Sequence, residues 1–69
     1  MKQIRVNIKS NNDVWFKSVN VVMTDDEVKI LKHCVDPDEY EVVWDYLVSK
    51  LERMSFPDDD WFIDTIKYL

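Results

Sequence analysis

Residues 24–40 read TDDEVKILKHCVDPDEY and contain two helix starts. Thr24 has the side chain of a helix N-cap, and Glu27 stands three residues later, as in a capping box. Asp36 is a second N-cap, because Pro37 follows it at the position where a helix tolerates proline. The sequence therefore predicts two helices, the first beginning after Thr24 and the second after Asp36.

The second predicted helix is the longer of the two, with four to five turns that end near Ser55. Phe56–Pro57 stops it, because the residue before a proline avoids the helical region. Its apolar residues recur every three or four positions, so we expect a buried stripe that includes Trp44. This stripe consists of Tyr40, Val43, Trp44, Leu47, Leu51 and Met54. The first helix is short, and Cys34 falls on its apolar face, where a small buried hydrophobe is expected.

A β-hairpin is predicted before the helices. Residues 3–9 alternate between apolar and polar side chains, which is typical of a half-buried strand, and residues 10–13 are turn formers. Residues 14–23 form a second β-rich run that contains two competing apolar sets. These sets are Trp15, Val19, Val21 and Met23, and Val14, Phe16 and Val22. The conflict predicts a bulge near Lys17–Ser18 or burial on both faces of this strand.

The last segment has features of both a helix and a strand. The aspartates of residues 58–60 follow a proline, as in the first turn of a helix, whereas residues 61–68 are rich in aromatic and β-branched side chains. We favour a strand, because an isolated two-stranded sheet is marginally stable. The prediction is one small α+β domain over residues 1–69 with the order ββααβ, and a short C-terminal helix is the alternative.

The size and composition exclude several classes of protein. A chain of 69 residues buries roughly 60% of its unfolded surface, so it makes a single domain of marginal stability. It has no glycine, which excludes the glycine-rich nucleotide and calcium loops. One cysteine excludes an internal disulfide. No stretch is apolar enough for a signal peptide or a membrane span, so we expect a cytoplasmic protein.

Candidate catalytic and metal-binding residues are few. His33 and Cys34 are neighbours on a helix, so their side chains diverge and cannot act as base and nucleophile. Residues 58–60 and Asp64 are carboxylates, but consecutive residues diverge and lack the spacing of a calcium loop. We therefore expect no enzyme activity, no cofactor and no metal site.

The charge distribution is the most unusual feature of the sequence. Residues 1–23 carry a net charge of +3 and residues 24–69 carry −8, which together give −5. Part of the acidic excess is explained by helix capping. The remainder gives the helical half a negative field that repels phosphate and attracts basic surfaces. The basic residues of the hairpin (Arg5, Lys9 and Lys17) are too sparse to predict direct binding of nucleic acid.

These features predict a non-catalytic acidic module that inhibits or regulates a basic partner, such as a nucleic-acid-binding protein. In size and charge the chain is similar to the small acidic inhibitors made by phages and toxin–immunity systems, a likeness that covers no residue pattern. The predicted contact surface combines the exposed face of the second helix with the following loop. Its residues are Glu41, Asp45, Glu52, Asp58, Asp59, Asp60 and Trp61. The alternative is a self-associating structural or accessory protein, a homodimer in which the amphipathic helix completes its core or the hairpin edge pairs with the second copy.

Overall fold

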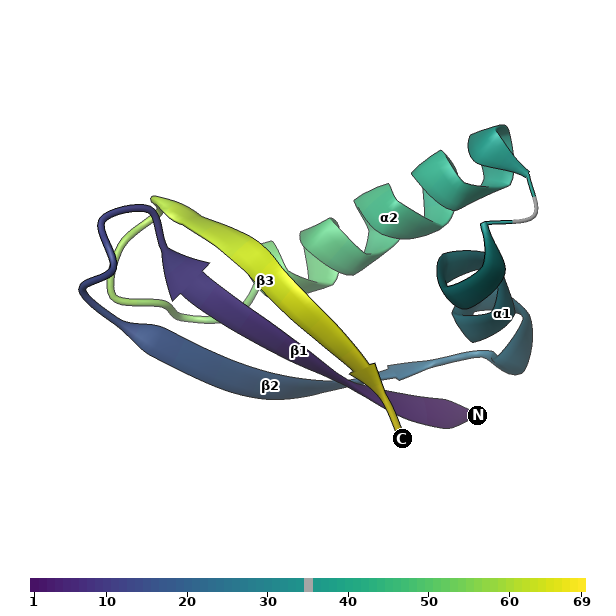
Figure 1. The fold of residues 1–69 in the computed structure, drawn as a ribbon, viewed down its shortest axis with the longest axis horizontal. Helices are drawn as coiled ribbons and strands as arrows, with labels where there is room; N and C mark the ends of the chain where they lie inside the picture. The colour runs from purple at the N-terminus through teal and green to yellow at the C-terminus, as the bar shows by residue number, and fades with distance from the viewer. Residues whose placement is uncertain (35) are drawn as a thin grey trace.

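The computed structural model describes residues 1–34 and 36–69, which form three strands and two helices (Figure 1). In chain order the elements are β1 (Lys2–Ser10), β2 (Phe16–Met23), α1 (Asp25–His33), α2 (Pro37–Glu52) and β3 (Trp61–Tyr68). The predicted order ββααβ is therefore confirmed, and the last element is a strand. Val35, which the sequence predicts on the apolar face of the first helix, lies outside the described residues.

The three strands form an antiparallel sheet in the order β2-β1-β3, with β1 in the centre. The helices pack on one face of this sheet, and the other face is open. The core consists of apolar side chains from β1, β2, α1 and α2. Its buried members are Ile4, Val6, Ile8, Val21, Met23, Val28, Leu31, Val43, Leu47 and Leu51. The half-buried residues of β3 pack at the margin of this core, so β3 is the less protected edge strand.

The side chains of β2 resolve the two apolar sets of residues 14–23. Val21 and Met23 are buried on the helix side, whereas Phe16 and Val22 lie exposed on the open face. The predicted bulge near Lys17 is wrong, because β1 and β2 pair in one unbroken register. The open sheet face accommodates the second apolar set without a bulge, since it leaves those side chains in solvent.

An irregularity of the sheet lies instead between β1 and β3. The register passes from Asn7–Thr65 to Ile8–Ile63, which leaves Asp64 as an extra residue in β3. Such a bulge bends its strand and interrupts regular pairing. The stretch of β3 before Asp64 and the stretch after it are therefore separate short ladders.

Both helix starts form as predicted. The Thr24 side chain accepts a hydrogen bond from the Glu27 backbone N–H (3.2 Å), and the Glu27 carboxylate accepts one from the Thr24 N–H (2.9 Å). The Asp36 side chain accepts from the Asp38 N–H (2.9 Å), with Pro37 in the first turn. These local hydrogen bonds satisfy N–H groups that have no partner inside a helix.

The ends of the helices differ from the prediction. Cys34 is exposed, because it is the C-cap of α1 and adopts a left-handed backbone (φ 51°) that turns it away from the core. Helix α2 ends at Glu52 rather than near Ser55, so Met54 lies beyond it in an exposed loop. Among residues 1–34 and 36–69, no helix is both long enough and apolar enough to cross a membrane.

Candidate functional site

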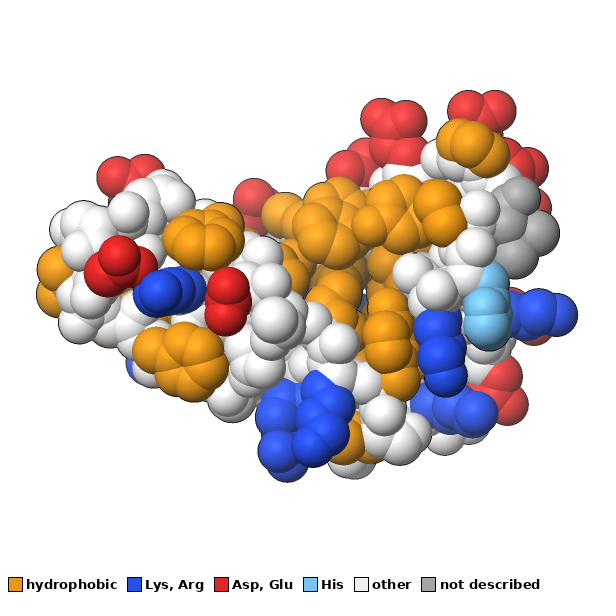
Figure 2. Space-filling model, in the orientation of Figure 1, with side chains coloured by type: hydrophobic (Ala, Val, Ile, Leu, Met, Phe, Trp, Pro, Cys, Tyr) orange, Lys and Arg blue, Asp and Glu red, His pale blue; other side chains and the backbone are white. Residues whose placement is uncertain are grey.

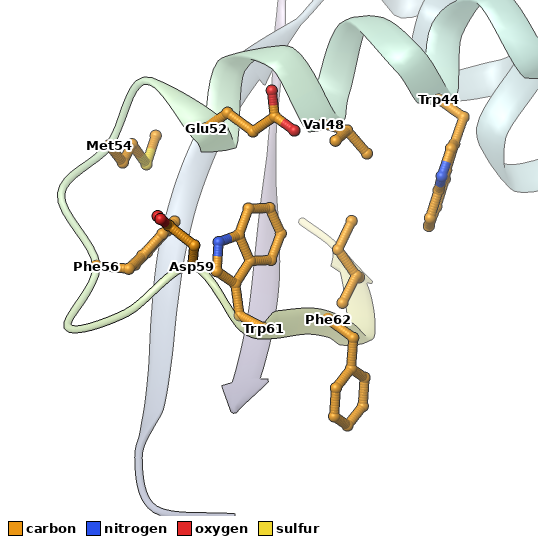
Figure 3. A pocket seen from close by; sticks show the side chains of 9 residues that line it. Trp44, Val48, Glu52, Met54, Phe56, Asp59, Trp61 and Phe62 are labelled. Carbon is orange, nitrogen blue, oxygen red and sulfur yellow. The ribbon is translucent and has the colours of Figure 1, made fainter. Parts of the chain in front are cut away.

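A groove lies between helix α2 and the start of strand β3 (Figure 3). Its volume is about 570 Å³, and its lining combines aromatic, aliphatic and acidic side chains. The lining residues are Trp44, Val48, Glu52, Met54, Phe56, Asp59, Trp61, Phe62 and Ile63. Glu52 and Asp59 carry the charges of this lining, which has no lysine or arginine. The groove is therefore an apolar surface with an acidic margin.

The helix contributes one wall of the groove. Figure 3 shows Trp44 and Val48 projecting from α2 toward β3, while Trp61 extends from β3 toward the helix. The ring of Phe62 points away from the helix, because Phe62 pairs with Lys9 and faces the open side of the sheet. Trp44 was predicted to be buried, but it is only half-buried, since it packs against the margin of the core and also lines the groove.

The loop between α2 and β3 is held by stacked aromatic rings. The Phe56 ring stacks on Trp15 (ring centroids 5.8 Å apart) and contacts Trp61 at a tilt (5.3 Å). Trp15 lies in the loop before β2, so the cluster ties the hairpin to the loop that forms the floor of the groove. Because aromatic pairs add stability beyond the area they bury, this cluster holds Trp61 in place.

The three consecutive aspartates have different roles. Asp58 accepts a hydrogen bond from the Trp15 indole N–H (2.9 Å) and another from the Asp60 backbone N–H (2.9 Å). Asp60 accepts from the Asn11 side-chain amide (3.2 Å). Both carboxylates thus attach the loop to the hairpin. Asp59 instead lines the groove, and of the three aspartates it is the one in that lining.

The three acidic residues predicted on the second helix are all exposed. Glu41, Asp45 and Glu52 are spaced by four and seven residues, which places them on one face of α2. Trp44 and Val48 lie beside that face, so the acidic stripe borders the groove along its helical wall. In Figure 2 a band of hydrophobic side chains follows α2, with acidic side chains along its upper margin.

The structure brings together only part of the predicted contact surface. Glu52, Asp59 and Trp61 meet at the groove, whereas Glu41 and Asp45 continue the acidic stripe beyond it. The predicted contact surface did not include the other six lining residues, which are Trp44, Val48, Met54, Phe56, Phe62 and Ile63. The spacing of Val48, four residues after Trp44, is a signal for it, but Ile63 became recognisable only once β3 was placed against the helix.

The open face of the sheet is the main alternative surface. Arg5 lies opposite Lys67 of β3, and basic side chains lie side by side on this face in Figure 2. The Lys9 ammonium group forms a hydrogen-bonded ion pair with the Asp13 carboxylate (3.1 Å), and this contact raises the pKa of Lys9. Lys17 pairs with Ile8 and so lies on the other side of the sheet, near the Phe56 ring.

The basic residues of the hairpin therefore do not gather into one footprint. A hydrogen-bonded row of neutral side chains crosses the centre of the open face instead. The side-chain NH₂ of Asn7 donates to the Thr65 hydroxyl (2.7 Å), and the Ser18 hydroxyl donates to the side-chain Oδ1 of Asn7 (2.6 Å). These bonds satisfy one another, so the row contributes to the cohesion of the three strands more than to a binding surface.

The candidate catalytic and metal-binding residues of the sequence are dispersed in the described part of the chain. No group of three or more histidine, cysteine or acidic side chains among residues 1–34 and 36–69 is placed to hold a metal ion. Cys34 and His33 are both exposed, and within this part of the chain neither side chain forms a hydrogen bond with a neighbouring base or acid. The groove is thus the feature of the described surface that most resembles a binding site.

No protein family model, curated protein sequence or solved structure matches this chain.

Proposed function

We propose that this chain is a non-catalytic protein-binding module that inhibits or regulates a basic partner protein. The observation that carries the proposal is the groove between α2 and β3, where the aromatic rings of Trp44 and Trp61 lie beside the carboxylates of Glu52 and Asp59. A lysine or arginine side chain suits such a surface, because its aliphatic stem packs on the rings and its charge meets the carboxylates. Aromatic residues within a groove are also the usual centres of binding energy at protein interfaces.

The long-range charge supports a basic partner. Residues 24–69 carry a net charge of −8, and the acidic stripe of Glu41, Asp45 and Glu52 extends the negative surface along α2. Such a field accelerates the encounter with a positive surface and opposes the approach of a phosphate backbone. Nucleic-acid-binding enzymes carry large positive grooves, so an enzyme of this class is the partner that we favour, with inhibition by occupation of its groove.

The experiment is an affinity pull-down from lysate of the source cells, washed first at low salt and then at high salt. The wild-type chain is compared with the charge-reversal variant D45K/D59K. A control of equal charge, D26K/E39K, alters exposed acids away from the groove, and its thermal midpoint is measured as well because both acids lie in the first turn of a helix. Partners are identified by mass spectrometry, and their affinity is then measured with purified protein.

We expect one stoichiometric basic partner that elutes at high salt. D45K/D59K should lose at least about tenfold in affinity, or about 1.4 kcal/mol, while its thermal midpoint stays within a few degrees of the wild type. The control should retain the partner. Equal binding by D45K/D59K would remove this surface from consideration, and recovery of the bait alone would contradict the proposal.

Self-association is the second candidate, and exposed apolar side chains on α2 favour it. Val42 is 70% exposed, and Tyr46 lies four residues later on the same face of the helix. The ammonium group of Lys50 lies 4.7 Å from the centroid of the Tyr46 ring, so this ring is partly covered within the chain itself. A dimer through this face would bury Val42 and should be visible as a concentration-dependent mass in solution.

A further inference from the structure

The outer edge of β3 is a second binding element beside the groove. β3 is an edge strand, so one side of its backbone pairs with β1 and the other side does not. The lining residues Trp61 and Ile63 belong to this strand, which means that the groove and the free strand edge adjoin. An unpaired strand edge is a template for an additional strand from another chain.

The hydrogen-bond pattern identifies the free peptide groups. The Asn11 backbone N–H donates to the Asp60 carbonyl (3.0 Å), and Lys9 pairs with Phe62 two residues along. In an antiparallel ladder the residues whose peptide groups face the neighbouring strand alternate. Asp60 and Phe62 therefore face β1, whereas the N–H and C=O groups of Trp61 and Ile63 point outward along the edge.

The opposite edge of the sheet is covered at one end by a lysine. The Ser10 N–H donates to the Trp15 carbonyl (3.1 Å), and the same alternation turns the peptide group of Val22 outward from β2. Lys50 of α2 reaches across this edge and donates to the Val22 carbonyl (3.0 Å). A lysine at a strand edge is a common device against pairing with another chain.

The bulge limits what the β3 edge can accept. Asp64 interrupts the ladder, so the regular stretch beside the groove is Trp61–Ile63. This length suits a short extended segment rather than a long strand. Glu52 and Asp59 place negative charge beside this stretch, which favours a segment that carries lysine or arginine.

We infer that the β3 edge at Trp61–Ile63 pairs with a short extended segment of the basic partner. The inference rests on the proposed function and adds the mode of recognition. The segment hydrogen-bonds to the outward peptide groups of Trp61 and Ile63. Side chains two residues apart point to the same face of a strand. One apolar side chain therefore lies against Trp44 and Ile63, and a lysine or arginine two residues away reaches Glu52 and Asp59.

The test uses the full chain and a blocked heptapeptide, Thr-Lys-Thr-Val-Thr-Lys-Thr, which places lysine two residues from valine in either direction of pairing. A peptide with glutamate in place of lysine is the control ligand, and E52Q/D59N is the control protein. Amide hydrogen exchange of individual residues is followed by NMR with and without saturating peptide. Phe62 serves as the internal reference, because its N–H is already paired with β1.

We expect the lysine peptide to slow exchange at Trp61 and Ile63 by at least tenfold and to leave Phe62 unchanged. The glutamate peptide and E52Q/D59N should show no protection. Binding that shifts the indole signals of Trp44 and Trp61 but leaves both amides unprotected would overturn edge pairing while the proposed function stands.

Two further outcomes would overturn the inference. Absence of peptide binding would overturn edge pairing. The proposed function is contradicted by a different result, namely a captured partner that binds D45K/D59K as well as the wild type. Protection of the Trp61 and Ile63 amides that rises with protein concentration, without peptide, would mean that a second copy of the chain occupies the edge.

Discussion

Ser10 shows how one side chain can complete a turn in a chain without glycine. It is fully buried at the end of β1, and its hydroxyl accepts hydrogen bonds from the backbone N–H groups of Val14 (2.7 Å) and Trp15 (3.1 Å). Asp13 adopts a positive φ of 57° in the same turn, a conformation that aspartate tolerates better than most residues. The buried hydroxyl of Ser10 thus has hydrogen-bond partners within the turn that it closes.

The variant S10A should destabilise the domain by about 1–3 kcal/mol, because it leaves two backbone N–H groups without their acceptor. Urea denaturation followed by tryptophan fluorescence measures this loss. S49A is the matched control, since Ser49 is exposed on α2 and should change stability by less than about 0.5 kcal/mol. If both variants unfold at the same urea concentration, Ser10 does not stabilise the turn.

Tyr68 makes the stability of the domain dependent on alkaline pH. Burial raises the pKa of its phenol above the ordinary value of 10.0, and the neighbouring Tyr40 adds to the shift. A folded-state pKa above the unfolded value means that the stabilisation is complete below pH 10 and is lost as the pH rises through the folded pKa. The folded state is thus more stable with a neutral Tyr68 phenol than with an ionised one.

Y68F should therefore flatten the loss of stability above pH 10. The measurement is the unfolding free energy from urea titrations at several pH values between about 8 and 11, for wild type and Y68F. Lys9 has its raised pKa in both proteins and contributes equally to both curves. Parallel curves for the two proteins would show that Tyr68 is not the group responsible.

At the scale of elements, the sequence predicted what depends on neighbouring residues. The capping box of Thr24 and Glu27 and the alternation of β1 are local patterns, and both form as expected. The prediction that Cys34 is buried was wrong, because Cys34 is a C-cap with a left-handed backbone. The helical periodicity of α1 therefore does not extend to its side chain. Without glycine at that position, no residue marked the end of the helix.

The candidate site was harder to predict, because its parts meet only in the folded chain. Asp58 and Asp60 form hydrogen bonds with Trp15 and Asn11, which are more than forty residues earlier in the sequence. Nothing in three consecutive aspartates distinguishes these two from Asp59. The sequence therefore predicted the three aspartates as one acidic surface. Only the folded position of the hairpin shows that Asp58 and Asp60 are bonded to it while Asp59 lines the groove.

The whole molecule has the dimensions of a small monomer. Its accessible surface is 4782 Å², close to the roughly 4600 Å² expected for a folded monomer of its mass. The extents of 34 × 22 × 18 Å describe a slightly elongated body, since the helices lie along one face of a narrow sheet. The ten core side chains are each at most 7% exposed within one chain.

We therefore expect the wild-type chain to remain monomeric at concentrations from about 10 to 200 μM, with a thermal midpoint independent of concentration. Sedimentation velocity and thermal scans measure both quantities. K50M is the informative variant, because it keeps the length of the side chain but removes the donor that covers the Val22 carbonyl at the β2 edge. K50M should associate over the same range, since the Val22 end of the β2 edge is then uncovered and this regular strand has no lysine across it. A wild-type dimer would instead favour self-association as the function, and amide protection at Trp61 and Ile63 would tell whether the β3 edge forms its interface.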